Sequence, residues 1–94
     1  MLIHIKRLGT KEQRYYKEFV EVLGSMKSKE KLEDFLEGIL TPAELTQIVK
    51  RLQIVKKLKK DVVQRAIAEE LEVGLATVTR GAREIRNGRF KYIK

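Results

Sequence analysis

A helical repeat of apolar residues runs through almost the whole chain, and little interrupts it. The sequence contains one proline, Pro42, and six glycines among 94 residues. Helix-breaking residues are therefore scarce, and apolar side chains recur every three or four positions, which is the period of an amphipathic helix. The pattern predicts an all-α fold. The length suits one small domain, which would gain stability by pairing with a second copy.

Capping signals divide this helical pattern into segments. Thr10 with Gln13 fits a capping box, Thr41-Pro42-Ala43-Glu44 adds proline at the first helical position, and Asp61 is predicted to cap a later helix. We expect helices at residues 11–26, 29–37 and 42–59, then two more between residues 61 and 86. Residues 1–9 are expected to form an N-terminal arm, and residues 10–94 the helical domain. The expected inward stripe of the third helix is Leu45, Ile48, Leu52, Val55 and Leu58.

Positive charge is concentrated in the second half of the chain. The formal net charge is +8, of which residues 1–50 contribute +1 and residues 51–94 contribute +7. Such an excess predicts attraction to a polyanion, although a solvated basic surface would look the same by composition alone. The chain has no cysteine and one histidine, which excludes disulfides and thiolate metal sites and fits a cytoplasmic protein.

Other classes of protein are disfavoured. No apolar run approaches the roughly 20 residues that span a bilayer, so no membrane association is expected. The sequence shows no convincing general acid and base, no nucleophile with a base and no phosphate-cradling loop, so the chain is not expected to be an enzyme.

Residues 61–86 are typical of a helix-turn-helix that reads DNA. Val63, Ile67 and Leu71 share one face of the first helix, and Val78, Ala82 and Ile85 share one face of the second. Glu72-Val73-Gly74 is expected to form the turn, with Val73 packed inward. The small residues that remain outward at the start of the second helix would let its N-terminus enter the major groove. The candidate DNA-binding residues are Gln64, Arg65, Leu75, Ala76, Thr77, Thr79 and Arg83.

Gly81 is unusual because a glycine inside a helix costs about 1 kcal/mol relative to alanine. One explanation is close packing of a neighbouring helix. The other is a bare backbone patch beside Arg80 that would suit a flat apolar ligand with a carboxylate.

Several motifs resemble the bacterial tryptophan repressor family. They are Leu40-Thr41-Pro42, Arg51, Gln64-Arg65 and the run Gly74-Leu75-Ala76-Thr77-Val78-Thr79-Arg80-Gly81, and the likeness extends over about residues 12–88. The resemblance implies a Trp-repressor-like helical bundle, an intertwined homodimer, and two reading heads about 34 Å apart on double-stranded DNA. It also implies a transcriptional repressor that an amino-acid corepressor, L-tryptophan in this family, controls.

Carried over by position, the family's ligand site would lie between Arg51 and Arg80, against Gly81. Arg80 would bind the carboxylate, and the ammonium would meet backbone carbonyls near Gly38 and Leu40 and at Thr41. Glu84 stands where tryptophan-binding members have a small hydroxyl residue, and it would either pair with the ammonium or crowd the site.

Two further departures distinguish this chain from the family's pattern. Glu72 replaces the usual turn glycine, so a left-handed backbone there would be strained. The family's final helix is missing or reduced to residues 89–94. Two alternatives therefore stay open: a regulator that needs no effector, and the DNA-binding subunit of a transposable element. A neighbouring integrase-like gene would favour the transposable element.

Overall fold

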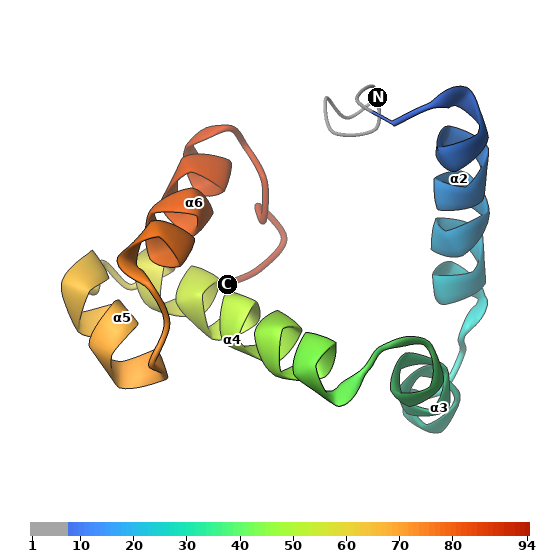
Figure 1. Ribbon diagram of the computed structural model, residues 1–94, viewed down its shortest axis with the longest axis horizontal. Coiled ribbons are helices and arrows are strands. Elements are labelled where there is room, and N and C mark those ends of the chain that lie inside the picture. The colour runs from blue at the N-terminus through green and yellow to red at the C-terminus, as the bar shows by residue number, and fades with distance from the viewer. Residues whose placement is uncertain (1–7) are drawn as a thin grey trace. The chain divides into compact units, whose positions relative to one another are not determined.

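Every regular element among residues 8–94 of the computed structural model is an α-helix (Figure 1). The structure describes residues 8–94, so most of the predicted arm at residues 1–9 lies outside the described residues. The helices are α2 (Thr10–Ser25), α3 (Lys29–Ile39), α4 (Pro42–Lys59), α5 (Gln64–Leu71) and α6 (Leu75–Arg86). The predicted all-α fold is confirmed.

The start of α4 forms as predicted. The Thr41 hydroxyl accepts a hydrogen bond from the Glu44 backbone N–H at 3.2 Å, and the Glu44 carboxylate accepts one from the Thr41 backbone N–H at 2.8 Å. This reciprocal pair is a capping box, and Pro42 follows it at the first helical position. The bond from the Thr41 backbone, with a smaller effect of the Thr41 side chain, lowers the pKa of Glu44 below its ordinary value of 4.5.

Two other predicted caps are wrong. Gly9 caps α2, Thr10 is already helical, and the Gln13 side-chain amide donates to the Leu8 carbonyl oxygen at 3.0 Å. Asp61 caps nothing, because it lies in a turn with φ of 61° while α5 begins three residues later. That turn closes the end of α4: the backbone N–H groups of Asp61 and Val62 donate to carbonyls of its last helical turn.

The chain divides into two compact units, residues 1–40 and residues 41–94. In the second unit α4, α5 and α6 pack against one another. Ile54, Ile67 and Val78, each at most 1% exposed, form the centre of its core. Leu58, Val62, Ala68, Leu71 and Val73 pack around them. The core therefore lies where the three helices meet.

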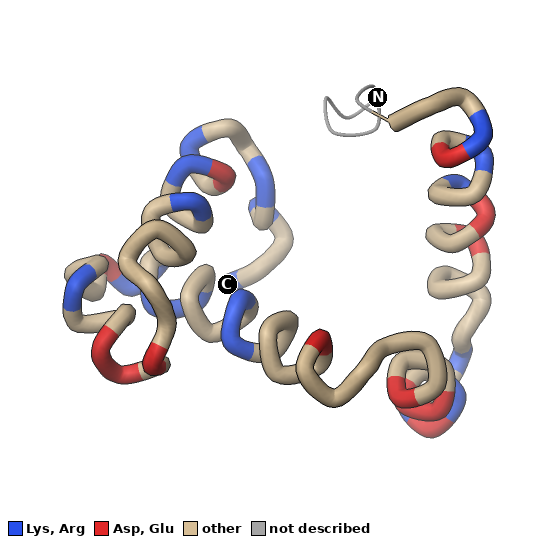
Figure 2. Tube along the Cα trace, in the orientation of Figure 1, with Lys and Arg blue, Asp and Glu red and all other residues tan. Residues whose placement is uncertain are grey.

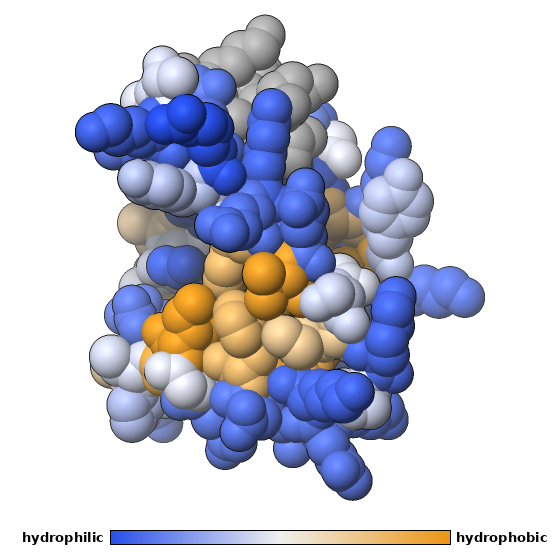
Figure 3. Space-filling view, turned by 90° about the vertical axis from the view of Figure 1, so that its right-hand side faces the viewer, coloured by the Kyte–Doolittle hydropathy of each residue, from blue (hydrophilic) through white to orange (hydrophobic). Residues whose placement is uncertain are grey.

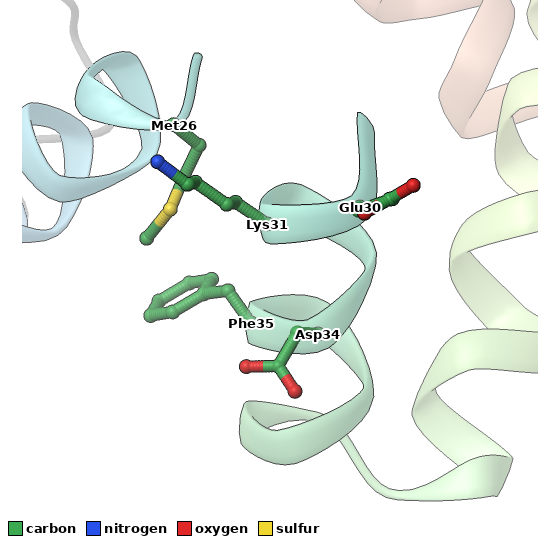
Figure 4. A pocket seen from close by; sticks show the side chains of 5 residues that line it. All are labelled: Met26, Glu30, Lys31, Asp34 and Phe35. Atoms are coloured by element: carbon green, nitrogen blue, oxygen red, sulfur yellow. The ribbon is translucent and has the colours of Figure 1, made fainter. Parts of the chain in front are cut away.

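The first unit holds α2 and α3, and neither helix has a fully buried residue. The rings of Phe19 and Phe35 lie 6.0 Å apart. A hollow of about 390 Å³ opens beside them, and Figure 4 shows Met26 and Phe35 on its apolar side with charged residues of α3 around it. Apolar side chains of this unit thus remain open to solvent in a single chain.

The predicted inward stripe of α4 is only partly buried. Val55 is buried, but Ile48 and Leu52 are 45% and 44% exposed, and Ile54 is buried instead. The reason is that α5 and α6 supply core partners only for the C-terminal half of α4. Other large apolar side chains are also exposed, and Figure 3 shows such side chains gathered in a patch bordered by hydrophilic residues.

Candidate nucleic-acid interface

A turn of three residues joins α5 to α6. Glu72 ends α5 in the left-handed conformation, with φ of 54° and ψ of 51°, which is the strained backbone that the loss of the usual turn glycine would produce. The Val73 backbone N–H donates to the Ala68 carbonyl oxygen at 3.1 Å, and the Val73 side chain packs against the core. Gly74 then caps α6 with an extended backbone. The turn thereby sets the angle at which α6 leaves α5.

Replacing Glu72 by glycine is expected to stabilise the protein by about 0.5–1 kcal/mol. Relief of the left-handed strain, roughly 1–2 kcal/mol, exceeds the roughly 0.5–1 kcal/mol of extra unfolded-state entropy of glycine. The melting temperature should rise by about 4–8 °C for each kcal/mol in a chain of this length. Glu69→Gly, inside α5, is the control, and it should destabilise by about 1 kcal/mol. A fall in melting temperature for Glu72→Gly would contradict the strain at Glu72.

Most of the predicted DNA-contacting side chains lie at the surface of α5 and α6. Gln64 and Thr79 are half-buried, and the Thr79 hydroxyl donates to the Gln64 side-chain oxygen at 2.9 Å. This bond ties the start of α5 to the middle of α6. The exposed members of the set are Arg65, Leu75, Ala76, Thr77 and Arg83.

The N-terminus of α6 is open and is flanked by small side chains. Gly74 offers no side-chain cap, and the first residues after Leu75 are alanine and threonine. The first backbone N–H groups of a helix lack partners within the helix and carry partial positive charge. Such an end can approach a phosphate or the edge of a base, because Gly74, Ala76 and Thr77 are small and Leu75 is the one large side chain of the first turn.

Basic residues are spread along α4, α5 and α6, together with a smaller number of acidic residues (Figure 2). The last turn of α4 carries Lys56, Lys57 and Lys59, and the last turn of α6 carries Arg83 and Arg86. Lys57 forms an ion pair with Glu70 at 3.0 Å, and this pair links α4 to α5. The Lys57 ammonium is therefore less available for another anion. The predicted attraction to a polyanion thus has a local source in the second unit.

A cavity of about 110 Å³ lies between α4 and α6. Arg51, Arg80 and Gly81, which the sequence predicted to form one ligand site, all line it. Gly81 also packs closely: a Cβ atom there would stand 3.1 Å from the Ile54 Cγ2 atom. Both sequence-based explanations of this glycine therefore have structural support, since it packs against α4 and also faces the cavity.

The family model described as Trp repressor protein matches residues 14–94. The chain belongs to the Trp repressor family. Members of this family are regulators rather than enzymes, as the sequence predicted for this chain. Among residues 8–94, no helix is long and apolar enough to cross a membrane, and no cluster of side chains is suited to a metal ion.

Curated relatives of this Trp repressor family member carry the name Trp operon repressor homolog. The protein of Vibrio parahaemolyticus is 34% identical over 77 residues, covering 81% of this chain and 75% of the relative. That of Actinobacillus succinogenes is 37% identical over 73 residues, covering 77% and 72%. That of Pasteurella multocida is 41% identical over 69 residues, covering 72% and 68%. No solved structure matches the chain.

The other residues of the predicted ligand site are not among those that line this cavity. Glu84 is only 8% exposed and is not among the residues that line the cavity. Thr41 is the N-cap of α4, and Gly38 and Leu40 belong to the first unit. Their part in binding an ammonium group stays a prediction.

Sequence reasoning missed Phe90 as a residue of this site. Its side chain lines the cavity together with Arg51, Arg80 and Gly81. The six residues after Gly88 are too few to predict a helix, and no repeat places them against another element. The one available signal was an aromatic residue in a short basic tail, which is too weak to assign a position.

Proposed function

We propose that this chain is a sequence-specific, DNA-binding transcriptional repressor that reads the major groove with α6. The observation that carries the proposal is the start of α6, where the exposed Ala76 and Thr77 follow Leu75, on a pair of helices that also carries the exposed arginines Arg65 and Arg83. A helix-turn-helix needs such an end at the base edges and cationic side chains at the phosphates. A repressor of this kind acts in the bacterial cytoplasm, and the absence of cysteines fits that reducing compartment.

We further propose that the working form is a homodimer. Ile48 and Leu52 on α4 and Phe19 on α2 are each more than a third exposed, and neither α2 nor α3 has a buried residue. Exposed apolar side chains in such number favour burial against a second copy. Two copies would also present two reading heads to successive major grooves on one face of the duplex.

The cavity between Arg51 and Arg80 is the proposed site for an effector. A guanidinium pairs well with a carboxylate, and Gly81 leaves the backbone bare beside it. These features suit L-tryptophan or a related amino acid as corepressor. An effector-independent regulator is the second candidate, and the presence of Phe90 in the same cavity favours it. The names of the relatives favour either of these over a transposable-element subunit.

Removing two arginines from the reading face should weaken DNA binding in a salt-dependent way. Arg65→Ala/Arg83→Ala is compared with the wild type on the duplex upstream of its own gene and on a scrambled duplex. Each lost phosphate contact should reduce the slope of log affinity against log salt concentration by roughly 0.9. Binding is measured by fluorescence anisotropy, with and without L-tryptophan.

The matched control is Lys11→Ala/Lys27→Ala, which removes the same charge from exposed positions of the first unit. An equal loss of affinity in the control would show that net charge, rather than the α5–α6 face, holds the DNA. Specific binding only with L-tryptophan would identify a corepressor. Specific binding in both conditions would identify the effector-independent regulator.

A further inference from the structure

The last residues of the chain fold back onto α4 and α6. After α6 ends, Gly88 and Phe90 adopt positive φ angles of 89° and 62°, which reverse the chain direction. The Arg89 backbone N–H donates to the Glu84 carbonyl oxygen at 2.9 Å. The Lys59 ammonium donates to the carbonyl oxygens of Phe90 and Ile93, so α4 holds both ends of this segment. Figure 1 shows the segment running from α6 back toward α4.

This anchoring places the Phe90 side chain at the cavity between Arg51 and Arg80. Left-handed backbone is uncommon for a bulky residue, so the contacts around Phe90 impose its conformation. With Phe90 in place the cavity measures about 110 Å³. Small-molecule sites usually measure roughly 300–1,000 Å³. The cavity therefore has room for only part of an aromatic amino acid while Phe90 lines it.

The Phe90 side chain is also placed so that it can move away from the cavity. Its side chain is 41% exposed, and the segment after it has no further core residue, with Tyr92 87% exposed. The hydrogen bonds that join the segment to α4 come from one lysine side chain, which donates to two backbone carbonyl groups. Such a contact can open without unfolding the three helices, whose core lies at Ile54, Ile67 and Val78.

We propose that Phe90 is the gate and the size filter of the ligand cavity. A free aromatic amino acid binds with its carboxylate at Arg80 and its ring in the part of the cavity next to the Phe90 phenyl ring. The cavity is too small for both, so the ligand and the C-terminal segment exclude each other. This inference rests on the proposed effector site, but it does not depend on DNA binding. Its consequence is that the wild-type chain binds an aromatic amino acid only in the fraction of molecules whose segment is open.

The first test is the affinity of full-length variants for L-tryptophan, measured by isothermal titration calorimetry. An open state populated at about 10% lowers the apparent affinity about tenfold, so Phe90→Ala should bind about tenfold more tightly than the wild type. Tyr92→Ala, in the same segment but exposed, should bind like the wild type. Phe90→Ala/Arg80→Ala should lose the gain, because the carboxylate partner is missing. Circular dichroism checks that each variant keeps its helical content.

The second test does not need a truncated Phe90 side chain. The chain has three phenylalanines, so incorporation of 4-fluorophenylalanine yields three fluorine NMR signals, and the Phe90 signal is the one absent from Phe90→Tyr, which keeps an aromatic ring at this position. Addition of L-tryptophan should move the Phe90 signal toward the position of fluorophenylalanine in an exposed peptide. This readout decides the question even if Phe90→Ala does not fold.

Three results would overturn the gate: equal affinity of wild type and Phe90→Ala, no binding by either, or weaker binding by Phe90→Ala. A Phe90 signal that L-tryptophan leaves unchanged would overturn it as well. DNA binding by the wild type is measured in the same samples. Tighter L-tryptophan binding by Phe90→Ala without specific DNA binding would sustain the gate and reject the proposed repressor. Specific DNA binding by the wild type, with no gain in the L-tryptophan affinity of Phe90→Ala, would sustain the proposed repressor and reject the gate.

Discussion

Replacing Ile67 by alanine is expected to destabilise the protein by about 2–5 kcal/mol and to abolish specific DNA binding. Ile67 has no exposed surface, and it contacts Ile54 of α4 and Val78 of α6 in one cluster. The truncation would leave a cavity between all three helices. Small domains have only about 5–15 kcal/mol of stability in total, so this loss is a large share. Urea unfolding followed by circular dichroism measures it.

Val63→Ala is the matched control for this substitution. Val63 precedes Ile67 by one helical turn, but it is 69% exposed and lies just before α5. Surface truncations of this kind usually change stability by no more than about 0.5 kcal/mol. If Val63→Ala destabilised as much as Ile67→Ala, the core of the second unit would not lie where the structure places it.

Replacing Leu52 by glutamate is expected to separate the proposed homodimer and to lower DNA affinity by about 10²–10⁴. Leu52 is 44% exposed on α4 beside Ile48 and Val49, which are 45% and 57% exposed. A buried carboxylate without a partner is costly, so a charge at this position opposes burial against a second copy. Each monomer would then bind one half-site, and the gain in affinity from linking two half-sites would be lost.

Sedimentation equilibrium measures the mass of Leu52→Glu, and fluorescence anisotropy measures its affinity for DNA. The neighbouring Gln53→Glu, at an exposed polar position, adds the same charge and should leave both unchanged. A Leu52→Glu chain that keeps the dimer mass would show that this face of α4 is not the dimer contact. The helical content of the monomer, from circular dichroism, separates loss of pairing from loss of folding.

Features decided by neighbouring residues could be predicted from the sequence. Thr41, Pro42 and Glu44 define the start of α4 through hydrogen bonds within one turn, and the predicted bounds of α4 are confirmed. The turn at Glu72 is likewise local and was predicted, whereas its left-handed backbone is a finding of the structure. The cluster of Arg51, Arg80 and Gly81 came from the family resemblance, and the structure brings the three to one cavity. Whether a ligand binds there remains a prediction.

Other features depended on contacts between distant residues. Thr10 and Asp61 carry capping side chains, but the chain uses Gly9 and Val63 at those helix starts. The periodicity of α4 could not show that Ile54 is buried while Ile48 is exposed, because that depends on which half of α4 meets α5 and α6.

By itself the sequence determined the helices, the basic second half and the family, because propensity, capping and charge act over a few residues. The tertiary structure alone decided the position of Phe90. No local rule brings residue 90 to Arg51, since the approach depends on two left-handed residues and on the bonds of Lys59, 31 positions earlier in the chain. Packing and long-range hydrogen bonds are properties of the folded chain, and a periodic pattern does not contain them.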